Sequence, residues 1–359
     1  MSARRGPEAP PVRVALVGAG LIGRTHLAAL GRSPRCVPCA VVDPSPGAAD
    51  LAAAAGVPHL DSLEALLAGE RPDGVILATP NRLHLEQTLA CLERGLAVLV
   101  EKPLAASVAE GERLVRAVRA GGGRVLVGHH RTHGSILRAA RELIADGALG
   151  RLVAVSGSAT FYKPDDYFDA GPWRRERGAG PILINLIHEV HSLRLLCGEI
   201  VAVQAFASNA VRGFAVEDTA AINLRFASGA LGTFLLSDTA ASPRSWEQSS
   251  GENPAYAHHG DEDCYLVAGT RGSLAVPTMR LHRYAREADR SWWKPFEESV
   301  VPVERDDPIE RQLEHFVDVI RGAAEPLVDV ASALANLRVT EAVAEAAATG
   351  GTVAIGQGR

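Results

Sequence analysis

The stretch VRVALVGAGLIGRTHLAALG, residues 12–31, joins a strand-like run, a glycine-rich turn and a helical pattern. Five of its first six residues are apolar and three are valine, which favours a buried strand. Gly18, Gly20 and Gly23 then follow in the spacing G-x-G-x-x-G. The first glycine permits a tight turn, the second lets the backbone approach a pyrophosphate, and the third allows close helix–strand packing. The order of strand, turn and helix therefore predicts a dinucleotide-binding unit, with Leu21 and Ile22 inside its phosphate-binding turn.

An acidic residue ends the next strand-like run, because Asp43 lies 20 residues after Gly23. A carboxylate at that position accepts hydrogen bonds from the adenosine ribose hydroxyls and repels a 2′-phosphate. The sequence therefore predicts NAD as the cofactor, with NADP less favoured.

The first third of the chain alternates strand-like runs with helical patterns. The strand-like runs are residues 12–18, 39–43, 74–80, 96–101 and 124–128. Such alternation is typical of an α/β fold in which a doubly wound parallel sheet carries helices on both faces. We expect a Rossmann-type NAD-binding domain over residues 11–128.

The pattern changes after residue 128. Strand-like runs at 151–162, 200–208, 219–227, 230–240 and 264–270 dominate, with a hairpin signal at Ser228-Gly229. They predict an α+β domain over residues 129–359 with a large, mostly antiparallel sheet, from which the last helix could pack back on the first domain. Few helices are available to cover this sheet, so one face is expected to be buried in a homodimer or homotetramer.

Composition limits the class of protein. Of the 359 residues, 47% are hydrophobic and 22% are charged, which is ordinary for globular proteins. The net charge of −5 provides no basic surface for nucleic acid. No apolar run approaches the ~20 residues of a membrane span. The five scattered cysteines argue against a disulfide framework, so we expect a cytoplasmic protein that acts on a small molecule without nucleic acid or membrane partners.

A polar stripe interrupts the otherwise aliphatic segment GPILINLIHEVHSLRLLCG, residues 180–198. At helical spacing, Asn185, His188, Glu189 and Ser192 share one face. Such a stripe is either a solvated surface or the wall of a site. Its two histidines are three residues apart, whereas helical zinc pairs are four apart, and we predict no metal site here.

Two short motifs carry a family resemblance. With ATPNRLH (78–84) and LVEKPLA (99–105), the sequence resembles the Gfo/Idh/MocA oxidoreductases over nearly its whole length. The Glu-Lys-Pro tripeptide is the most specific of these marks. The resemblance implies a cofactor site that includes Thr79, Pro80, Asn81, His84, Glu101 and Lys102.

The resemblance also implies catalytic roles. Lys102 would contact both cofactor and substrate hydroxyl, and the catalytic histidine of the second domain would be His188. Many relatives carry aspartates where this chain has Ile184 and His191. Asn185 could replace the first aspartate as a hydrogen-bonding partner, but an amide cannot accept a proton at neutral pH.

The segment YKPDDYFDAGPWRRERG, residues 162–178, mixes aromatic, acidic and basic residues just before the polar helix. Aromatic rings and carboxylates suit a sugar or cyclic polyol, whereas Lys163 or the arginines could bind a carboxylate. We predict that Tyr162, Lys163 and Trp173 lie near the substrate, together with His188.

The expected activity is NAD-dependent hydride transfer to or from a secondary alcohol or ketone of a sugar, cyclitol, related polyol or hydroxy acid. In that reaction His188 would be the general base or acid, Lys102 its electrostatic partner and Asn185 an orienting group. Two alternatives stay open at this point. One is a glycoside hydrolase that retains NAD and oxidises its substrate transiently, and the other is a non-catalytic NAD-binding regulator.

Overall fold

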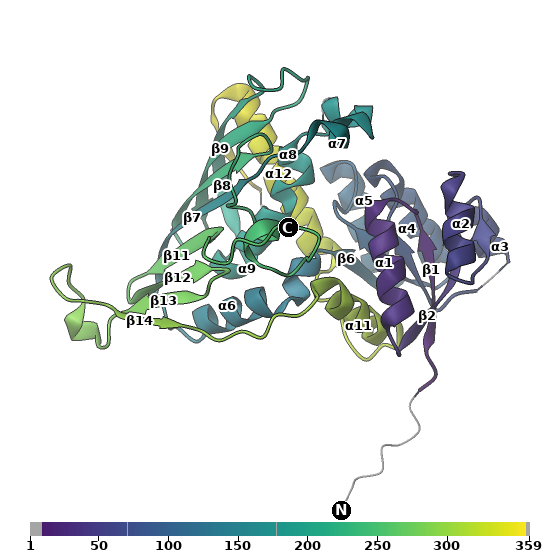
Figure 1. Ribbon diagram of the computed structural model, residues 1–359, viewed down its shortest axis with the longest axis horizontal. Coiled ribbons are helices and arrows are strands. Elements are labelled where there is room, and N and C mark those ends of the chain that lie inside the picture. Colours follow the sequence, from purple (N-terminus) through teal and green to yellow (C-terminus); the bar gives the residue numbers. More distant parts are fainter. Residues whose placement is uncertain (1–8, 70, 177, 357–359) are drawn as a thin grey trace, which may run out of the picture. The chain divides into compact units, whose positions relative to one another are not determined.

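The computed structural model describes residues 9–69, 71–176 and 178–356, which form two compact units (Figure 1). The first unit comprises the described residues up to His130 together with Ile309–Leu334. The second comprises Arg131–Pro308 and the described residues from Ala335 onwards. A late segment of the chain is thus part of the first unit, while the domain boundary after residue 128 stays a prediction.

The first unit is built on a six-stranded sheet in which every neighbouring pair is parallel. The strand order is β3-β2-β1-β4-β5-β6. The strands are β1 (Val12–Val17), β2 (Cys36–Val42), β3 (His59–Leu60), β4 (Gly74–Leu77), β5 (Ala97–Glu101) and β6 (Val125–Gly128). This order confirms the predicted doubly wound sheet. The sequence pattern does not predict β3, which has only two residues.

Helices cover both faces of this sheet. Alternate residues of a strand point to opposite faces, so each strand contributes side chains to two buried clusters. Val14 and Leu16 of β1 belong to one buried cluster, while Ala15 and Val17 belong to the other. The first cluster includes residues of α1 (Leu21–Arg32), α2 (Gly47–Ala54) and α11 (Pro308–Ile320). The second includes residues of α3 (Leu63–Ala68), α4 (His84–Glu93), α5 (Val108–Gly121) and the start of α12 (Val330–Thr349).

The second unit contains a nine-stranded sheet with the order β14-β13-β12-β11-β7-β10-β9-β8-β15. Its strands are β7 (Leu152–Thr160), β8 (Ile200–Ser208), β9 (Thr219–Phe226), β10 (Leu231–Ser237), β11 (Tyr265–Gly269), β12 (Gly272–Val276), β13 (Arg280–Arg283), β14 (Glu297–Val300) and β15 (Thr352–Ala354). Within the described part of the chain, β7 and β10 are the one parallel pair. The predicted mostly antiparallel sheet is confirmed.

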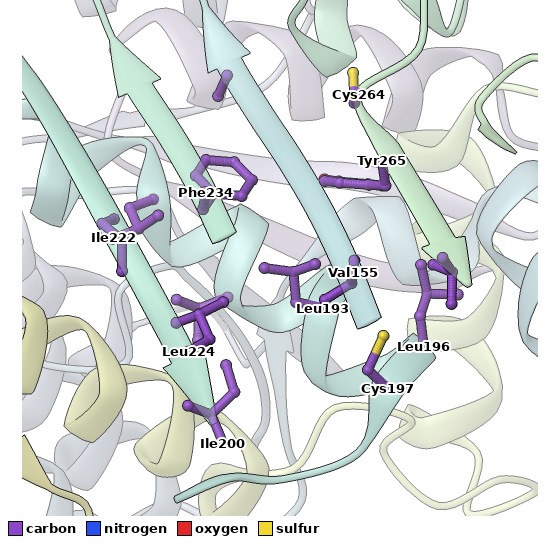
Figure 2. Close-up of a cluster of buried hydrophobic side chains, with 14 of the residues drawn as sticks. Val155, Leu193, Leu196, Cys197, Ile200, Ile222, Leu224, Phe234, Cys264 and Tyr265 are labelled. Carbon is purple, nitrogen blue, oxygen red and sulfur yellow. The ribbon is translucent and has the colours of Figure 1, made fainter. Parts of the chain in front are cut away.

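One face of this sheet carries the core of the second unit. Residues of α6 (Ser135–Ala145), α9 (Leu186–Cys197) and the later part of α12 pack against it. Figure 2 shows Leu193 of α9 between Leu224 of β9 and Val155 of β7. The opposite face is solvent-exposed and carries several apolar side chains, namely Val153, Phe206, Leu231, Leu235 and Leu266. No helix among the described residues has the length and apolar character that a bilayer span requires.

Candidate active site

The glycine-rich turn is shaped for close approach of a phosphate. Gly18 has a φ of 101°, and a Cβ added there would lie 2.5 Å from the carbonyl oxygen of Ala78. A Cβ on Gly23 would lie 2.0 Å from the carbonyl oxygen of Gly18. Gly20, in contrast, is exposed and faces open space, and it precedes α1 without capping that helix through a side chain. The uncapped N–H groups at the start of α1 are suited to a pyrophosphate.

The two kinds of glycine predict different consequences of substitution. Gly20→Ala is expected to leave the melting temperature nearly unchanged, because the added methyl group meets no protein atom within 4 Å. It should weaken NADH binding at least about tenfold, because the methyl group occupies the approach of the pyrophosphate. Gly23→Ala should instead lower the free energy of unfolding by about 1–3 kcal/mol through overpacking. Thermal unfolding and NADH fluorescence titration check both, and wild-type affinity in Gly20→Ala would contradict the assignment.

Asp43 is fixed beside this turn by backbone hydrogen bonds. Its Oδ2 accepts a bond of 2.7 Å from the N–H of Ala19, and its Oδ1 accepts one of 2.8 Å from the N–H of Ser45. Burial raises the pKa of Asp43, but these hydrogen bonds outweigh burial and leave the pKa below its usual range. The carboxylate is therefore ionised at neutral pH and lies next to the phosphate-binding turn.

The loop after β4 contains the predicted Thr79, Pro80 and Asn81. Thr79 donates a hydrogen bond of 2.6 Å from Oγ1 to Oε1 of Gln87, Pro80 is exposed, and Asn81 is half-buried. His84 is buried, and its ring nitrogens lie 2.9 Å from the Thr79 carbonyl oxygen and 2.8 Å from that of Pro103. Burial lowers the pKa of His84. The imidazole thus links the loop after β4 to the loop after β5.

Lys102 follows the end of β5 and is half-buried. Its backbone N–H lies 3.2 Å from Oε2 of Glu101, and Oε1 of the same carboxylate lies 2.8 Å from Nε2 of His26. Burial raises the pKa of Glu101, but the hydrogen bond with His26 and the nearby positive charges leave it lowered. Glu101 is itself buried, so it supports the backbone of Lys102 as an internal anion. His26 is a supporting residue that the sequence pattern does not identify.

In the second unit, the polar helix is divided at Asn185. The sequence predicts one helix over residues 180–198, whereas the structure has α8 (Pro181–Ile184) and α9 (Leu186–Cys197). Asn185 has φ −104° and ψ −50° and stands at the N-terminus of α9. The N–H of His188 donates a hydrogen bond of 3.1 Å to the Asn185 carbonyl oxygen. Both side chains are only partly buried, so the first turn of α9 presents them together.

The rest of the polar stripe lies in the interior, so Glu189 and Ser192 belong neither to a solvated surface nor to the wall of a site. Glu189 accepts a hydrogen bond of 2.7 Å from Nη1 of the buried Arg131 and another from the hydroxyl of Tyr265. The hydroxyl of Ser192 donates to the carbonyl oxygen of His188. A buried carboxylate is tolerated here because Arg131 supplies a hydrogen-bonded counter-charge.

His191, which stands where many relatives have an aspartate, is buried and neutral. Nδ1 lies 2.9 Å from Nδ2 of Asn336, and Nε2 lies 2.5 Å from Oγ1 of Thr132. The Nδ2 group of Asn336 can only donate, so Nδ1 of His191 accepts and Nε2 carries the proton and donates to Thr132. Burial and the nearby Arg194 and Arg131 lower the pKa of His191 to about 3. His191 therefore does not replace the missing carboxylate.

The predicted substrate residues fall into two sets. Lys163 is joined to Asn185, because its Nζ donates a hydrogen bond of 2.8 Å to Oδ1 of the asparagine. Tyr162 and Trp173 are both more than half exposed, at 56% and 55%. The Arg212 guanidinium lies 5.0 Å from the centre of the Tyr162 ring, and that of Arg174 lies 5.5 Å from the Trp173 ring.

Two charged residues beside Lys163 are not predicted from the sequence. Asp238 lies 3.2 Å from Nζ of Lys163 and is 3% exposed, and Arg212 lies 3.4 Å from the same carboxylate. Asp238 directly follows β10, which ends at Ser237, whereas the strand-like run in the sequence extends to residue 240. An acidic residue at the end of a strand is the signal that could have identified it, as it identifies Asp43.

Comparison with known proteins connects these sites to a family. A model described as oxidoreductase family, NAD-binding Rossmann fold, matches residues 12–129, and the Gfo/Idh/MocA C-terminal domain model matches residues 137–275. The chain belongs to the Gfo/Idh/MocA oxidoreductase family. The resemblance carried by the Thr-Pro-Asn and Glu-Lys-Pro motifs is confirmed, and so is NAD as the family cofactor that fits the first unit.

Individual members of the family give the same result. The 1,5-anhydro-D-fructose reductase of Ensifer adhaerens is 30% identical over 301 residues, covering 80% of this chain and 81% of that protein. Inositol 2-dehydrogenase of Rhizobium meliloti is 24% identical over 339 residues, covering 94% and 97%. The WlbA dehydrogenase of Bordetella pertussis, solved with NADH and UDP-GlcNAcA, has a TM-score of 0.78 at 23% identity and covers 97% of this chain and 100% of that one. This structural likeness supports the fold.

Proposed function

We propose that this Gfo/Idh/MocA oxidoreductase is an NAD-dependent dehydrogenase or reductase of a secondary alcohol or ketone in a sugar, cyclitol, related polyol or hydroxy acid. The observation that carries the proposal is the set of groups at the carboxyl ends of β1, β2, β4 and β5. They are the open glycine turn, the ionised Asp43, the Thr79 loop and Lys102. The named relatives, an anhydrofructose reductase and an inositol dehydrogenase, support this substrate class.

The chain's own residues supply binding and proton transfer. NAD, when bound, provides the nicotinamide ring that accepts or returns a hydride. We assign to His188 the proton of the substrate hydroxyl, which its imidazole takes up during oxidation and returns during reduction. Lys102 would donate a charge-assisted hydrogen bond to the reacting oxygen and stabilise negative charge that develops there. Asn185 would orient the substrate beside His188, while Tyr162 and Trp173 offer aromatic surfaces to a ring.

The family favours net hydride transfer over both alternatives raised by the sequence, because its model is that of an oxidoreductase. Asp43 supports NAD over NADP, since its ionised carboxylate repels a 2′-phosphate. The exposed apolar face of the nine-stranded sheet supports a homodimer or homotetramer, because large apolar patches on a protein surface are usually interfaces. Five cysteines without a disulfide fit a reducing, cytoplasmic setting.

The test is NADH formation, measured by absorbance, with a panel of sugars, inositols, sugar acids and hydroxy acids. Each compound is offered with NAD and separately with NADP, and the matching ketones are offered with NADH. We expect turnover with one class of compound and a preference for NAD. Tight NADH binding without turnover in either direction would overturn the proposal in favour of a regulator. Release of sugar without net NADH would overturn it in favour of a hydrolase.

A further inference from the structure

Three polar residues that are distant in sequence meet in the second unit: Lys163, Asn185 and Asp238. The sheet explains why two of them meet. β7 and β10 are parallel neighbours in which Thr160 pairs with Ser237, so the residues that follow these strands lie at the same end of the sheet. Lys163 and Asp238 are those residues, and the N–H of Lys163 donates a hydrogen bond of 2.8 Å to the Asp238 carbonyl oxygen.

The side chains of Asp238, Lys163 and Asn185 contact one another in that order. The Lys163 ammonium lies 3.2 Å from Oδ2 of Asp238 and 2.8 Å from Oδ1 of Asn185. Only 11% of the Lys163 side chain and 3% of the Asp238 side chain are exposed. The ammonium also lies 5.1 Å from the centre of the Tyr167 ring, so an aromatic wall confines it further.

This contact fixes which way the Asn185 carboxamide points. An ammonium only donates hydrogen bonds, so the atom beside it must be the amide oxygen. The remaining group is the Nδ2 NH₂ of the amide, and no acceptor within the described residues bonds to it. Asn185 can therefore offer donors to a ligand, whereas an aspartate at this place would offer an acceptor.

Asp238 is held in place from its other side. Nε of Arg212 lies 3.4 Å from Oδ1 of Asp238, and Nη2 of the same arginine donates hydrogen bonds of 2.6 and 2.8 Å to the carbonyl oxygens of Lys163 and Asp238. The turn that carries Arg212 is fixed in turn, because Asp218 accepts hydrogen bonds from the N–H groups of Val211 and Arg212. The carboxylate that holds Lys163 thus belongs to a built and largely buried framework.

We propose that Lys163 and Asp238 are positioning residues that hold Asn185 so that the Nδ2 NH₂ of its amide donates a hydrogen bond to an oxygen acceptor of the substrate. The inference rests on the proposed function, because it takes Asn185 and His188 as parts of one substrate site. It also narrows the substrate: the group beside the reacting carbon must carry an acceptor oxygen, as a hydroxyl, ether, carbonyl or carboxylate does. Lys163 then acts on the substrate through Asn185.

A double-mutant cycle tests this arrangement with the compound that the wild type turns over best. Asp238→Asn should lower kcat/KM by about ten- to a hundredfold through misplacement of the amide. In the Asn185→Ala background the same substitution should change kcat/KM less than about threefold, because the group it positions is gone. Asp165→Asn is the matched control, since Asp165 pairs with Arg212 at the exposed end of the same framework, 3.5 Å away, and should leave kcat/KM unchanged.

A second measurement does not depend on turnover. In protein labelled with ¹⁵N-asparagine, the Asn185 side-chain amide signal is assigned by its loss in Asn185→Ala. Lys163→Met should shift that signal in the cofactor-free protein, whereas Asp165→Asn should not. If the wild type turns over no compound, the proposed function fails, and the amide signal alone decides the positioning.

Two results would overturn the inference. One is an equal loss of kcat/KM from Asp238→Asn in the presence and absence of Asn185, which is what a general structural defect produces. The other is an unchanged Asn185 amide signal in a folded Lys163→Met protein. Thermal unfolding of each variant accompanies both measurements, and Lys163→Met replaces Asp238→Asn in the cycle if the latter does not fold.

Discussion

Lys102→Ala is expected to lower kcat by about 10²–10³-fold, the usual loss when one donor to a developing oxyanion is removed. The dissociation constant of NADH should change far less, because the glycine turn and Asp43 are untouched. Removal of the side chain also leaves the backbone bond from Lys102 to Glu101 in place, so the loop after β5 keeps its support. Steady-state kinetics and NADH fluorescence titration separate the two effects.

The chain offers a matched control for this experiment, because it contains only three lysines. Lys294 is exposed in the segment between β13 and β14, and Lys294→Ala should leave kcat and NADH binding unchanged. Lys102→Arg should also lose most activity, since a guanidinium is larger and less compact than an ammonium. Normal turnover in Lys102→Ala would remove Lys102 from the reaction.

His188→Ala is expected to lower kcat by about 10²–10⁴-fold, the typical contribution of a general acid or base. The fold should survive this substitution, because His188 is only partly buried. NADH affinity should again stay close to that of the wild type.

The same substitution at His191 should instead lower the stability of the fold more than kcat. His191 is buried between Thr132 and Asn336, with a pKa lowered to about 3, so it cannot exchange a proton near neutral pH. His191→Ala removes two buried hydrogen bonds and should lower the free energy of unfolding by about 2 kcal/mol or more. Kinetics and chemical denaturation of the two variants, measured together, check the contrast. Equal losses of activity at equal stability would argue against a special role for His188.

Local sequence patterns account for the first unit well. The strand, glycine turn and helix at residues 12–32 are predicted because each step follows from neighbouring residues. The same is true of Asp43 at the end of its strand. The backbone partner of Asp43, Ala19, also lies in the predicted turn, although its bond to the carboxylate depends on the pairing of β1 with β2.

In the second unit, local sequence patterns do not predict which site residues contact one another. The sequence predicts Lys163 and Asn185 as site residues, but not their contact, because they lie in the segment after β7 and at the start of α9, which only the folded chain brings together. Asp238 follows a strand as Asp43 does, but its contact with Lys163 depends on the pairing of β7 with β10, which no local pattern reveals. Helical periodicity places Glu189 on the polar stripe, yet it cannot reveal that Arg131, 58 residues earlier, makes that position internal. The break at Asn185 interrupts an apolar pattern that otherwise reads as continuous helix.

The first unit has a consequence for biosynthesis, because its core is completed by residues made late. Leu313, Phe316 and Val317 of α11 are fully or almost fully buried in one of its clusters, and Val328 and Leu334 are buried in the other. A nascent chain that has emerged only as far as His130 lacks all of them and exposes part of both faces of its parallel sheet. The first unit therefore cannot complete its core when only its N-terminal segment has been synthesised. Apolar surface on its sheet stays uncovered until the segment up to Leu334 has also been synthesised.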